Sequence, residues 1–500
     1  MTAVPTIGVE EEYLLLDPAT GGPVPAAPRV LRRTEHLSWP RAELMQYQIE
    51  AATGVCAGLD EVRDQLWRMR GRLSEAAAGE GCRLVASGIS PYAGPGLESV
   101  TALPRYQELA RRYPAMTACA GTCACHVHVA VPSRDAAVRA LARLRPWLAC
   151  LLAVAANSPI TAGRPAGWQS RRYAMVSRWP TGRAPGLWRD SAEYDAAVRD
   201  LIGRAEALDE GSVYFLARLS PRYPTVEVRV ADICPDVDTA VLLAGLVRGL
   251  VMTALDELPE PGGSSFVDRG LVAAARGGLA GTGIDPRSGL AVPQRCLLDR
   301  LRAHVDRALR DAGDAETVDR GLALLAERGT GADRQLRYWR ADPRPAGFIR
   351  ALARTTLTAP DAGQGAHLAA LAVQLQTLHD LGVAFGVPGE LVAAQARELA
   401  AVRDALRRYG PAVRAVRAVP AGPGRFADAG DQRRFDHLLR QGATDRSAAL
   451  DVLHQTLAGI LAVVDAALPR PDAAGVREMY LDLYAATLRQ SRRLLSTLDR

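Results

Sequence analysis

The chain has 500 residues, of which 48% are apolar and 23% are charged, and its formal net charge is +6. This composition excludes a disordered protein. The length exceeds one ordinary hydrophobic core, so two or more domains, or one large domain with additions, are expected. The sequence contains no lysine, so all 61 basic residues are arginine. A Walker A loop, a protein kinase, a lysine Schiff base and an SxxK nucleophile are therefore excluded.

The distribution of charge and the spacing of the cysteines indicate which binding partners and which cellular compartment to expect. The arginines are spread among 55 acidic residues, which favours an arginine-rich surface over a nucleic-acid-binding one. No uninterrupted apolar run reaches the length of about 18 residues that spans a bilayer, so no membrane partner is predicted. The first residues, MTAVPTIGVEEE, lack an export signal, and the eight cysteines are dispersed with none after Cys296. We expect reduced thiols and a cytoplasmic protein.

Periodicity predicts strands and helices through the first 360 residues. Alternation over residues 7–16, ending in the turn signal DPATGG, predicts a strand. Apolar residues at helical spacing predict a helix over 60–79 and another from the N-cap Ser133 towards 157, kinked at Pro146. The other predicted elements are strands at 82–88, 123–131, 212–220 and 224–232 and a buried helix at 238–255. This pattern predicts an α+β fold with helices on one side of a sheet.

From residue 361 to residue 500 the periodicity is helical only. We expect helices near 365–385, 389–409, 431–466 and 473–498, which could form an appended all-α bundle. The predicted organisation is an α+β domain at 1–360 and a helical domain at 361–500. The helical segment carries no catalytic constellation, so its expected role is packing. Oligomerisation, recruitment of a partner and covering a site on the first domain are the alternatives.

The first strand carries the most unusual residues, three consecutive glutamates. Side chains alternate along a strand, so Glu10 and Glu12 share one face while Glu11 points to the other with Val9 and Tyr13. Two carboxylates on one face of a strand repel each other and lose hydration, so a positive partner is required. That partner is an arginine or a bound cation.

Other strands repeat this division into a polar and an apolar face. His126 and His128 share a face in CHVHV, Glu227 and Arg229 share one in PTVEVRVAD, and Glu50 ends the apolar stretch MQYQIE. Such strands build a polar site above a hydrophobic core. Carboxylates with a histidine fit Mg²⁺ or Mn²⁺ better than Zn²⁺.

Two simpler interpretations remain open for these residues. The glutamates could form surface ion pairs while the histidines are structural. The run CAGTCACHVH also resembles a zinc site, but it lacks the paired CxxC spacing, and strand alternation separates Cys125 from the histidines. Structural zinc is therefore not predicted.

Residues 163–189 interleave arginines with aromatic residues. The arginines are Arg164, Arg171, Arg172, Arg178 and Arg183, and the aromatic residues are Trp168, Tyr173, Trp179 and Trp188. Guanidinium groups bind phosphate or carboxylate in bidentate fashion, and aromatic rings can stack on a base. A nucleotide or an acidic substrate is the favoured interpretation, with a single-stranded nucleic acid as the alternative.

Six ordered motifs resemble those of the type-2 glutamate-cysteine ligase family, whose members are also called carboxylate-amine ligases. They are GVEEEY (8–13), QIEAATGVC (48–56), CHVHV (125–129), NSPITAGR (157–164), RLSPRYPTVEVRVADICP (218–235) and GTGADRQ (329–335). The resemblance spans about residues 5–358. It implies a glutamine-synthetase-like fold, in which a curved antiparallel sheet surrounds ATP, divalent ions and a carboxylate substrate. It also implies that ATP converts a carboxylate to an acyl phosphate, from which an amine displaces phosphate.

The resemblance implies roles for particular residues. Those that match metal-ligand positions are Glu10, Glu12, Glu50, His126 and Glu227, with Mg²⁺ expected and Mn²⁺ an alternative. Arg229 would neutralise phosphate or the acyl phosphate, so the expected catalytic group is Arg229, Glu227, Glu10 and Glu12. Candidates for binding substrate or ATP are Arg164, Arg172, Arg178 and His128, the last of which could instead orient a ligand or pack.

One departure from the family pattern bears on activity. Relatives commonly have Trp-Asp where this chain has Phe215 and Leu216, so one acid near the site is absent. The leading hypothesis is an ATP-dependent ligase that joins a carboxylate, most simply that of glutamate, to cysteine or another amine. The alternatives are a catalytically impaired relative that binds a nucleotide or metabolite and acts through its C-terminal helices, and phosphoryl transfer without ligation. The expected partners are small molecules, and a homo-oligomer is possible.

Overall fold

The computed structural model describes residues 4–256, 266–285 and 288–358, residue 360, and a few scattered residues between 375 and 460. The chain divides into two compact units, residues 1–360 and 361–500. Every element described below belongs to the first unit. The four helices predicted between 365 and 498 lie almost entirely outside the described residues.

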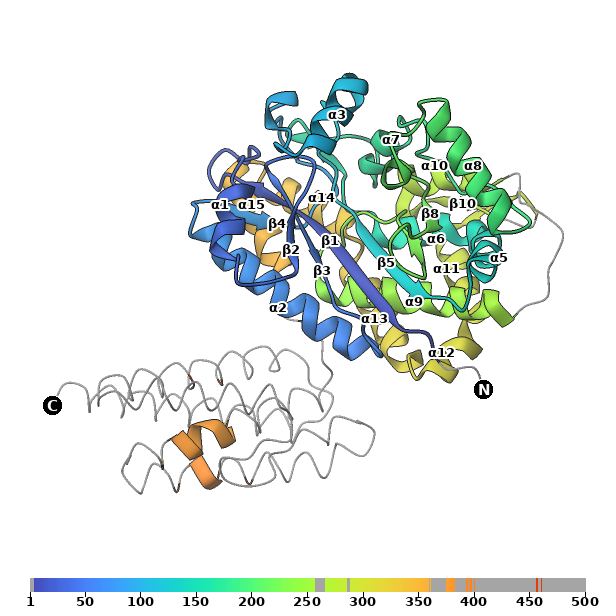
Figure 1. Cartoon of the computed structure of the whole chain (residues 1–500). Helices are drawn as coiled ribbons and strands as arrows, with labels where there is room; N and C mark the ends of the chain where they lie inside the picture. Colours follow the sequence, from blue (N-terminus) through green and yellow to red (C-terminus); the bar gives the residue numbers. More distant parts are fainter. Residues whose placement is uncertain are drawn as a thin grey trace. The chain divides into compact units, whose positions relative to one another are not determined.

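A seven-stranded antiparallel sheet forms the centre of the first unit (Figure 1). Its strands are β1 (Ile7–Leu16), β2 (Pro40–Ala42), β3 (Gln48–Ala52), β4 (Arg83–Val85), β5 (Cys125–Ala130), β8 (Ala217–Leu219) and β9 (Thr225–Val228). The order is β2-β3-β1-β5-β9-β8, and β4 pairs with the end of β1. Two short ribbons pair β6 (Ile160–Thr161) with β7 (Arg164–Pro165) and β10 (Thr282–Ile284) with β11 (Ala291–Pro293). This architecture confirms the predicted antiparallel α+β fold.

Helices cover the apolar face of the sheet. Those that contact its strands most are α2 (Leu59–Ala78), α5 (Arg134–Leu144), α9 (Val237–Asp256) and α15 (Pro345–Thr356). The other α-helices of the first unit are α1 (Ala27–Arg33), α3 (Pro104–Arg112), α4 (Pro114–Thr117), α6 (Leu148–Ala155), α7 (Arg171–Val176), α8 (Ser191–Gly203), α10 (Val267–Gly277), α11 (Gln294–His304), α12 (Asp306–Ala312), α13 (Ala315–Arg328) and α14 (Gly331–Ala341).

The predicted helix after Ser133 is present but broken. The Ser133 hydroxyl accepts a hydrogen bond from the Ala136 amide, so it is the expected N-cap of α5. A single 3₁₀ turn, Arg145–Trp147, contains Pro146 and separates α5 from α6. Proline lacks the amide hydrogen that a continuous helix needs at this point, so the expected kink is a change of helix.

Helix α9 is long and apolar enough to cross a bilayer by length and composition alone. In the structure 89% of the most apolar 18-residue stretch of α9 is buried, and α9 packs against β5, α2 and α13. Burial of this kind is typical of a core helix, which agrees with the prediction of a buried helix at this position.

Glu11 occupies the helix-covered face of β1, where it is fully buried with Arg70 of α2. The Arg70 guanidinium donates to Glu11 from Nε at 3.0 Å and from Nη2 at 2.5 Å. Its remaining hydrogen bonds reach the carbonyls of Cys234, Pro235 and Thr356. Arg70 therefore ties β1 to the segment that precedes α9 and to the last turn of α15. The middle glutamate of the three is structural.

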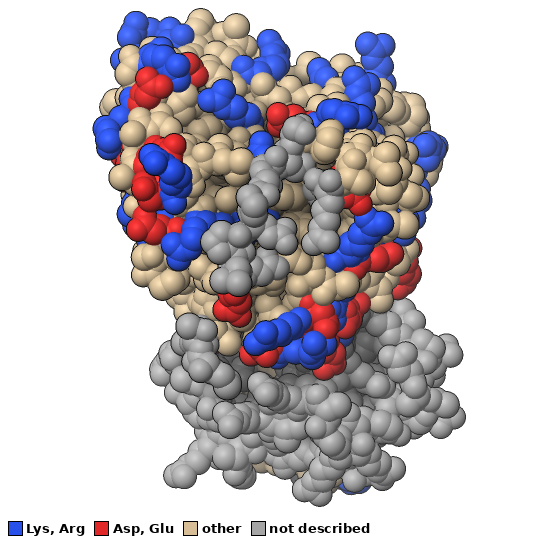
Figure 2. Space-filling model, turned by 90° about the vertical axis from the view of Figure 1, so that its right-hand side faces the viewer, with Lys and Arg blue, Asp and Glu red and all other residues tan. Residues whose placement is uncertain are grey.

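All eight cysteines are free thiols, as their dispersed spacing predicts. Arginine and acidic side chains are interspersed on the face of the molecule shown in Figure 2. This mixture agrees with the arginine-rich surface expected from composition.

Candidate functional site

The sheet register brings the predicted site residues together on the face opposite Glu11. Glu10 of β1 is paired with His126 of β5, and Glu12 is paired with Glu50 of β3. One strand further along, His128 is paired with Glu227 of β9. Side chains of directly paired residues lie on the same face of a sheet. Strands that are far apart in the sequence thus supply one polar surface.

These residues line a cleft of about 420 Å³, which we call the main cleft. It is lined by Glu10, Glu12, Glu43, Leu44, Glu50, Arg105, Tyr106, Leu109, His126, His128, Asp209, Gly211, Tyr214, Arg218, Ser220, Pro221, Arg222, Tyr223, Glu227 and Arg229. Its volume suits a substrate of nucleotide size.

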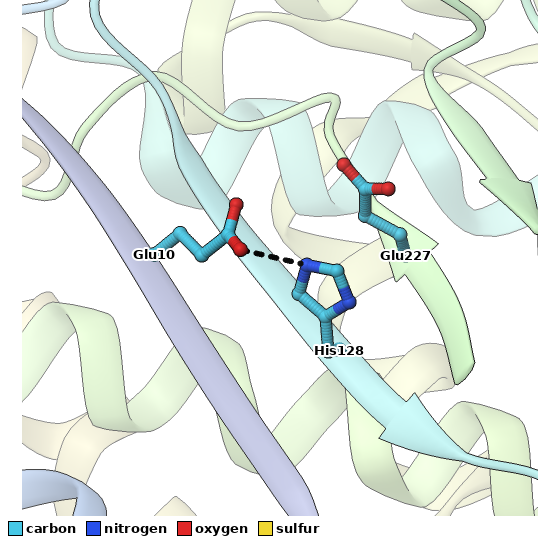
Figure 3. Close-up of side chains that lie close together, drawn as sticks. All are labelled: Glu10, His128 and Glu227. Carbon is cyan, nitrogen blue, oxygen red and sulfur yellow. Dashed lines mark ion pairs between the residues drawn. The ribbon is translucent and has the colours of Figure 1, made fainter. Parts of the chain in front are cut away.

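Glu10, His128 and Glu227 form a group that could hold a metal ion, which we call the cation group. One ligand atom from each residue lies within 4.8 Å of those of the other two. Figure 3 shows the three side chains converging from β1, β5 and β9, with His128 Nε2 3.5 Å from Glu10 Oε1. His128 Nδ1 lies 2.9 Å from the Thr225 hydroxyl, so the ring is oriented and Nε2 is directed at the carboxylates.

The histidine nitrogens test whether this group fits a cation. His126 Nε2 and His128 Nε2 are buried, and neither has a hydrogen-bond partner within the described chain. A buried nitrogen without a partner is costly unless a ligand supplies one. Two such atoms among carboxylates fit a divalent cation with oxygen and nitrogen ligands. The sequence assigned His126 to the metal and His128 to the substrate, whereas the structure groups His128 with Glu10 and Glu227.

Glu227 is also held by two arginines. Arg218 of β8 donates to its two carboxylate oxygens at 2.8 and 3.2 Å, and Arg229 donates to Oε1. Burial alone would raise the pKa of Glu227, but the two guanidinium charges outweigh it and hold that pKa well below its usual range. A cation at this carboxylate would therefore share it with Arg218 and Arg229.

The carboxylates of the main cleft fall into two electrostatic classes. For Glu10, the imidazoles of His126 and His128, each with a nitrogen 3.5 Å from its carboxylate, outweigh burial and lower the pKa well below its usual range. Glu12 and Glu43 have pKa values raised to about 7, and Glu50 has a pKa raised to about 8. Burial is the main cause in each case, and repulsion from neighbouring carboxylates adds to it. A positively charged ligand would stabilise the ionised form of the second class, Glu12, Glu43 and Glu50.

A smaller cavity of about 80 Å³ shares part of its lining with the main cleft, and we call it the side pocket. It is lined by Glu12, Glu43, Leu44, Ala120, Thr122, His126, Arg172, Val176, Trp179, Tyr214, Leu216 and Arg229. Leu216, where the family resemblance implies an acid, lines this pocket and is absent from the lining of the main cleft.

The predicted arginines separate in the structure. Arg172 is buried at the side pocket, next to Trp179 and Leu216. Arg164 is exposed in β7 and lines neither cavity. Arg178 is exposed and lines a third, very small pocket with Met175 and Trp179. Within the described residues, only Arg172 of these three reaches the polar face of the sheet.

Sequence reasoning missed a buried network that fixes the position of Arg172. Asp232 accepts hydrogen bonds from the Asn157 amide at 2.9 Å, the Ser158 hydroxyl at 2.6 Å and the Ser170 hydroxyl at 2.7 Å. Asn157 in turn accepts a hydrogen bond from Gln335 at 2.8 Å. All of these residues except Ser170 belong to the motifs NSPITAGR, RLSPRYPTVEVRVADICP and GTGADRQ. The motifs therefore contained the residues of the network but did not indicate that they contact one another.

Sequence reasoning also missed Arg218 and Glu43 as site residues. Arg218 belongs to the motif RLSPRYPTVEVRVADICP and is paired with Glu227 across β8 and β9. Pairing of the two predicted strands, 212–220 and 224–232, could therefore have indicated that Arg218 lies beside Glu227. Glu43 lies between β2 and β3, where no periodicity predicts the direction of a side chain. It faces both the main cleft and the side pocket.

The fold is similar to those of a glutamate–cysteine ligase and a glutathione synthetase of known structure. The glutamate–cysteine ligase of Francisella tularensis in complex with AMP has a TM-score of 0.54 at 12% identity, and the match covers 81% of this chain and 94% of that one. A bifunctional glutathione synthetase from Pasteurella multocida has a TM-score of 0.52 at 14% identity, covering 70% of this chain and 52% of that one. At such low identities these matches establish the fold alone.

Sequence comparison identifies the family. The model of glutamate-cysteine ligase family 2 matches residues 6–346. A protein of Mycolicibacterium vanbaalenii with the provisional name glutamate–cysteine ligase 2-2 is 42% identical over 348 residues, which cover 68% of this chain and 94% of the relative. A provisionally named glutamate–cysteine ligase 2-1 of Nocardia farcinica is 40% identical, covering 73% and 98%. The chain belongs to glutamate-cysteine ligase family 2, as its motifs predict.

Proposed function

We propose that the protein is an ATP-dependent carboxylate–amine ligase that forms an amide through an acyl phosphate. The observation that carries the proposal is the pair of buried histidine nitrogens that have no hydrogen-bond partner in the described chain and lie among the carboxylates that line the main cleft. Membership of a ligase family and a fold shared with a glutamate–cysteine ligase bound to AMP support it. Glutamate is the simplest acid substrate, and cysteine or another amine is the acceptor.

The chemistry requires two anions, the carboxylate and the γ-phosphate of ATP, to come into contact. A Mg²⁺ or Mn²⁺ ion, when bound, would supply the charge that lowers their repulsion. Glu10, His128 and Glu227 are the residues that would hold it, and Glu12, Glu50 and His126 are further candidates beside them. No covalent enzyme nucleophile is needed, which agrees with the absence of the lysine-based motifs from the sequence.

Arg229 is the residue that this chain offers to the transferring phosphoryl group. Its side chain is 15% exposed at the main cleft and is anchored by Glu227, which supports a rise in its pKa. A guanidinium fixed in this way can donate to phosphate oxygens without reorganising. Arg229 would thus stabilise the charge that develops as the acyl phosphate forms.

The test uses glutamate labelled with ¹⁸O in its γ-carboxylate, ATP, Mg²⁺ and a panel of amines, with products analysed by mass spectrometry. An acyl-phosphate ligase transfers one label to inorganic phosphate and yields an amide. The Glu10→Gln variant should lose turnover, which excludes a contaminating activity. Unlabelled phosphate with amide formation would refute the acyl phosphate. ADP release without an amine would favour phosphoryl transfer, and no turnover with any amine would favour a catalytically impaired relative.

A further inference from the structure

The two arginines that bind the carboxylate of Glu227 differ in how they hold it. Arg218 is directly paired with Glu227 across β8 and β9, and its Nε and Nη2 donate to the two carboxylate oxygens. Arg229 reaches the same carboxylate through Nη1 alone, and its Nε and Nη2 have no hydrogen-bond partner within the described residues. A bidentate contact fixes the plane and direction of a carboxylate, which a single hydrogen bond does not. The orientation of Glu227 is therefore set by Arg218.

The other end of the Arg218 guanidinium is fixed by a turn of the backbone. Nη1 donates to the carbonyls of Glu210, Gly211 and Val213 at 3.3, 3.2 and 2.9 Å. All three nitrogens of the guanidinium are thus engaged, and the side chain is 8% exposed. The donors of a guanidinium form a rigid planar fork, so partners at both ends leave it little freedom to rotate. Arg218 is a fixed group, whereas Arg229 keeps donors for a ligand.

The turn that holds Arg218 is itself anchored to α3. The Asp209 carboxylate caps the turn by accepting from the Ser212 amide at 2.8 Å. Arg105 of α3 donates to both oxygens of Asp209 at 2.7 and 2.8 Å and to the Ser212 hydroxyl at 3.0 Å. Arg105, Asp209 and Gly211 all line the main cleft. Arg218 thus connects a wall of the main cleft to a carboxylate of the cation group.

The charge of Arg218 and its position have opposite effects on a cation at Glu227. A guanidinium next to the carboxylate repels a divalent ion that approaches the same oxygens. A partner that orients a metal-binding side chain increases metal affinity, typically by about 10- to 100-fold. With Glu227 held by Arg218, its ligand atom lies within 4.8 Å of those of Glu10 and His128. Substitutions that separate charge from orientation can therefore show which effect dominates.

We propose that Arg218 is a positioning residue that holds the Glu227 carboxylate towards Glu10 and His128 for the cation. The proposal deepens the proposed function and rests on its assignment of a cation to these three residues. The two arginines then have separate roles at one carboxylate. Arg218 orients Glu227 and acts through it, while Arg229 offers its unused Nε and Nη2 to the phosphoryl group.

Titration of the full-length protein with Mn²⁺ in the absence of nucleotide tests the proposal by binding alone, with free Mn²⁺ measured by electron paramagnetic resonance. Arg218→Lys keeps the positive charge, but an ammonium group cannot reach both carboxylate oxygens and the three carbonyls. We expect its dissociation constant for Mn²⁺ to rise about 10- to 100-fold. Arg218→Met also removes the charge, and we expect weaker binding here too, because the loss of orientation outweighs the relief of repulsion.

Two further variants separate positioning from folding. Arg164→Lys makes the same change at an exposed position outside both cavities, so it should bind Mn²⁺ like wild type. Asp209→Asn loosens the turn from a side chain that is 41% exposed, so it tests the same connection if both Arg218 variants fail to fold. We expect it to weaken Mn²⁺ binding by about threefold, because Arg218 still holds Glu227 but the turn behind it is less fixed.

Three results would overturn the proposal. One is an Arg218→Lys protein that binds Mn²⁺ within about twofold of wild type, even with a lower melting temperature, because Arg218 would then support only the fold. Another is tighter binding by Arg218→Met than by wild type, because charge would then dominate. The third, with both Arg218 variants unfolded, is unchanged affinity in Asp209→Asn. A wild-type protein that does not bind Mn²⁺ would overturn the cation assignment and this proposal together. The expected losses of affinity without any ligase turnover by wild type would support the positioning role and refute only the proposed function.

Discussion

Replacing Glu11 by glutamine tests the division of the three glutamates between two faces. Glu11 and Arg70 are both 0% exposed, so the variant leaves a buried guanidinium without its counter-charge. Removing one partner of a buried ion pair costs roughly 3–5 kcal/mol. The Tyr13 hydroxyl, which donates to the same carboxylate, also loses a charged acceptor. We therefore expect a large loss of stability from a change of a single charge.

The expected shift in melting temperature follows from the size of the first unit. An unfolding entropy of about 2.1 cal/mol/K per residue gives roughly 0.8 kcal/mol/K for the unit that spans residues 1–360. A loss of roughly 3–5 kcal/mol then lowers the melting temperature by about 4–6 °C. Differential scanning calorimetry of the full-length chain at pH 8.0 in EDTA measures this shift.

The neighbouring variant Glu12→Gln is the matched control and should not lower the melting temperature. Burial and the nearby Glu50 raise the pKa of Glu12 to about 7, so its charge at pH 8.0 is unfavourable in the folded state. The amide oxygen can still accept the hydrogen bond from the Ala124 amide. We expect an unchanged or higher melting temperature. A Glu11→Gln protein within 1 °C of wild type, or an equal fall in both variants, would refute the assignment of faces.

Three further predictions address the cation group, the carboxylates with raised pKa values and the buried network. Glu10→Gln should weaken binding of Mn²⁺ or Mg²⁺ by roughly 10- to 100-fold in a calorimetric titration, because one of three ligands is lost; unchanged affinity would place the ion elsewhere. In EDTA, stability should fall as the pH rises from 7.0 to 8.5, because Glu12, Glu43 and Glu50 retain protons in the folded state that they lose above pH 4.5 when unfolded. Saturating Mg²⁺ should reduce this fall, and a flat melting temperature in EDTA would contradict the raised pKa values. Asp232→Ala should lower stability by about 3 kcal/mol or more because it leaves three buried donors unsatisfied, as urea unfolding can measure, whereas an unchanged midpoint would show that the network relaxes or admits water.

The alternating strands were predictable because strand geometry has a strict period of two. Once 7–16 and 123–131 are taken as strands, the faces of Glu10 and His128 follow, and the observed register brings them together. The six motifs added the family and hence the antiparallel sheet. The same alternation separated Glu11 from its neighbours but did not identify Arg70, which lies 59 residues further along the chain.

The arginine assignments show where sequence reasoning ends. Arg164, Arg172 and Arg178 looked equivalent because each lies among aromatic residues. Only tertiary packing decides which guanidinium turns inward: Arg172 lies in a short helix whose N-cap, Ser170, is bonded to Asp232. Arg164 instead lies in a two-residue ribbon at the surface. Glu43 was equally hidden, because a loop has no period from which to predict a direction.

The hydrogen bonds of Arg70 bear on where the chain can be cut or extended. Thr356 accepts from Arg70 through its carbonyl and from the Ala86 amide through its hydroxyl, at 3.2 and 2.9 Å. The end of α15 is thus linked through Arg70 to β1, the strand that also carries Glu10. A gene fusion or truncation made beyond residue 358 would keep these hydrogen bonds. One made a single helical turn earlier would remove Thr356 and its hydrogen bond with Arg70, the residue that holds Glu11 of β1.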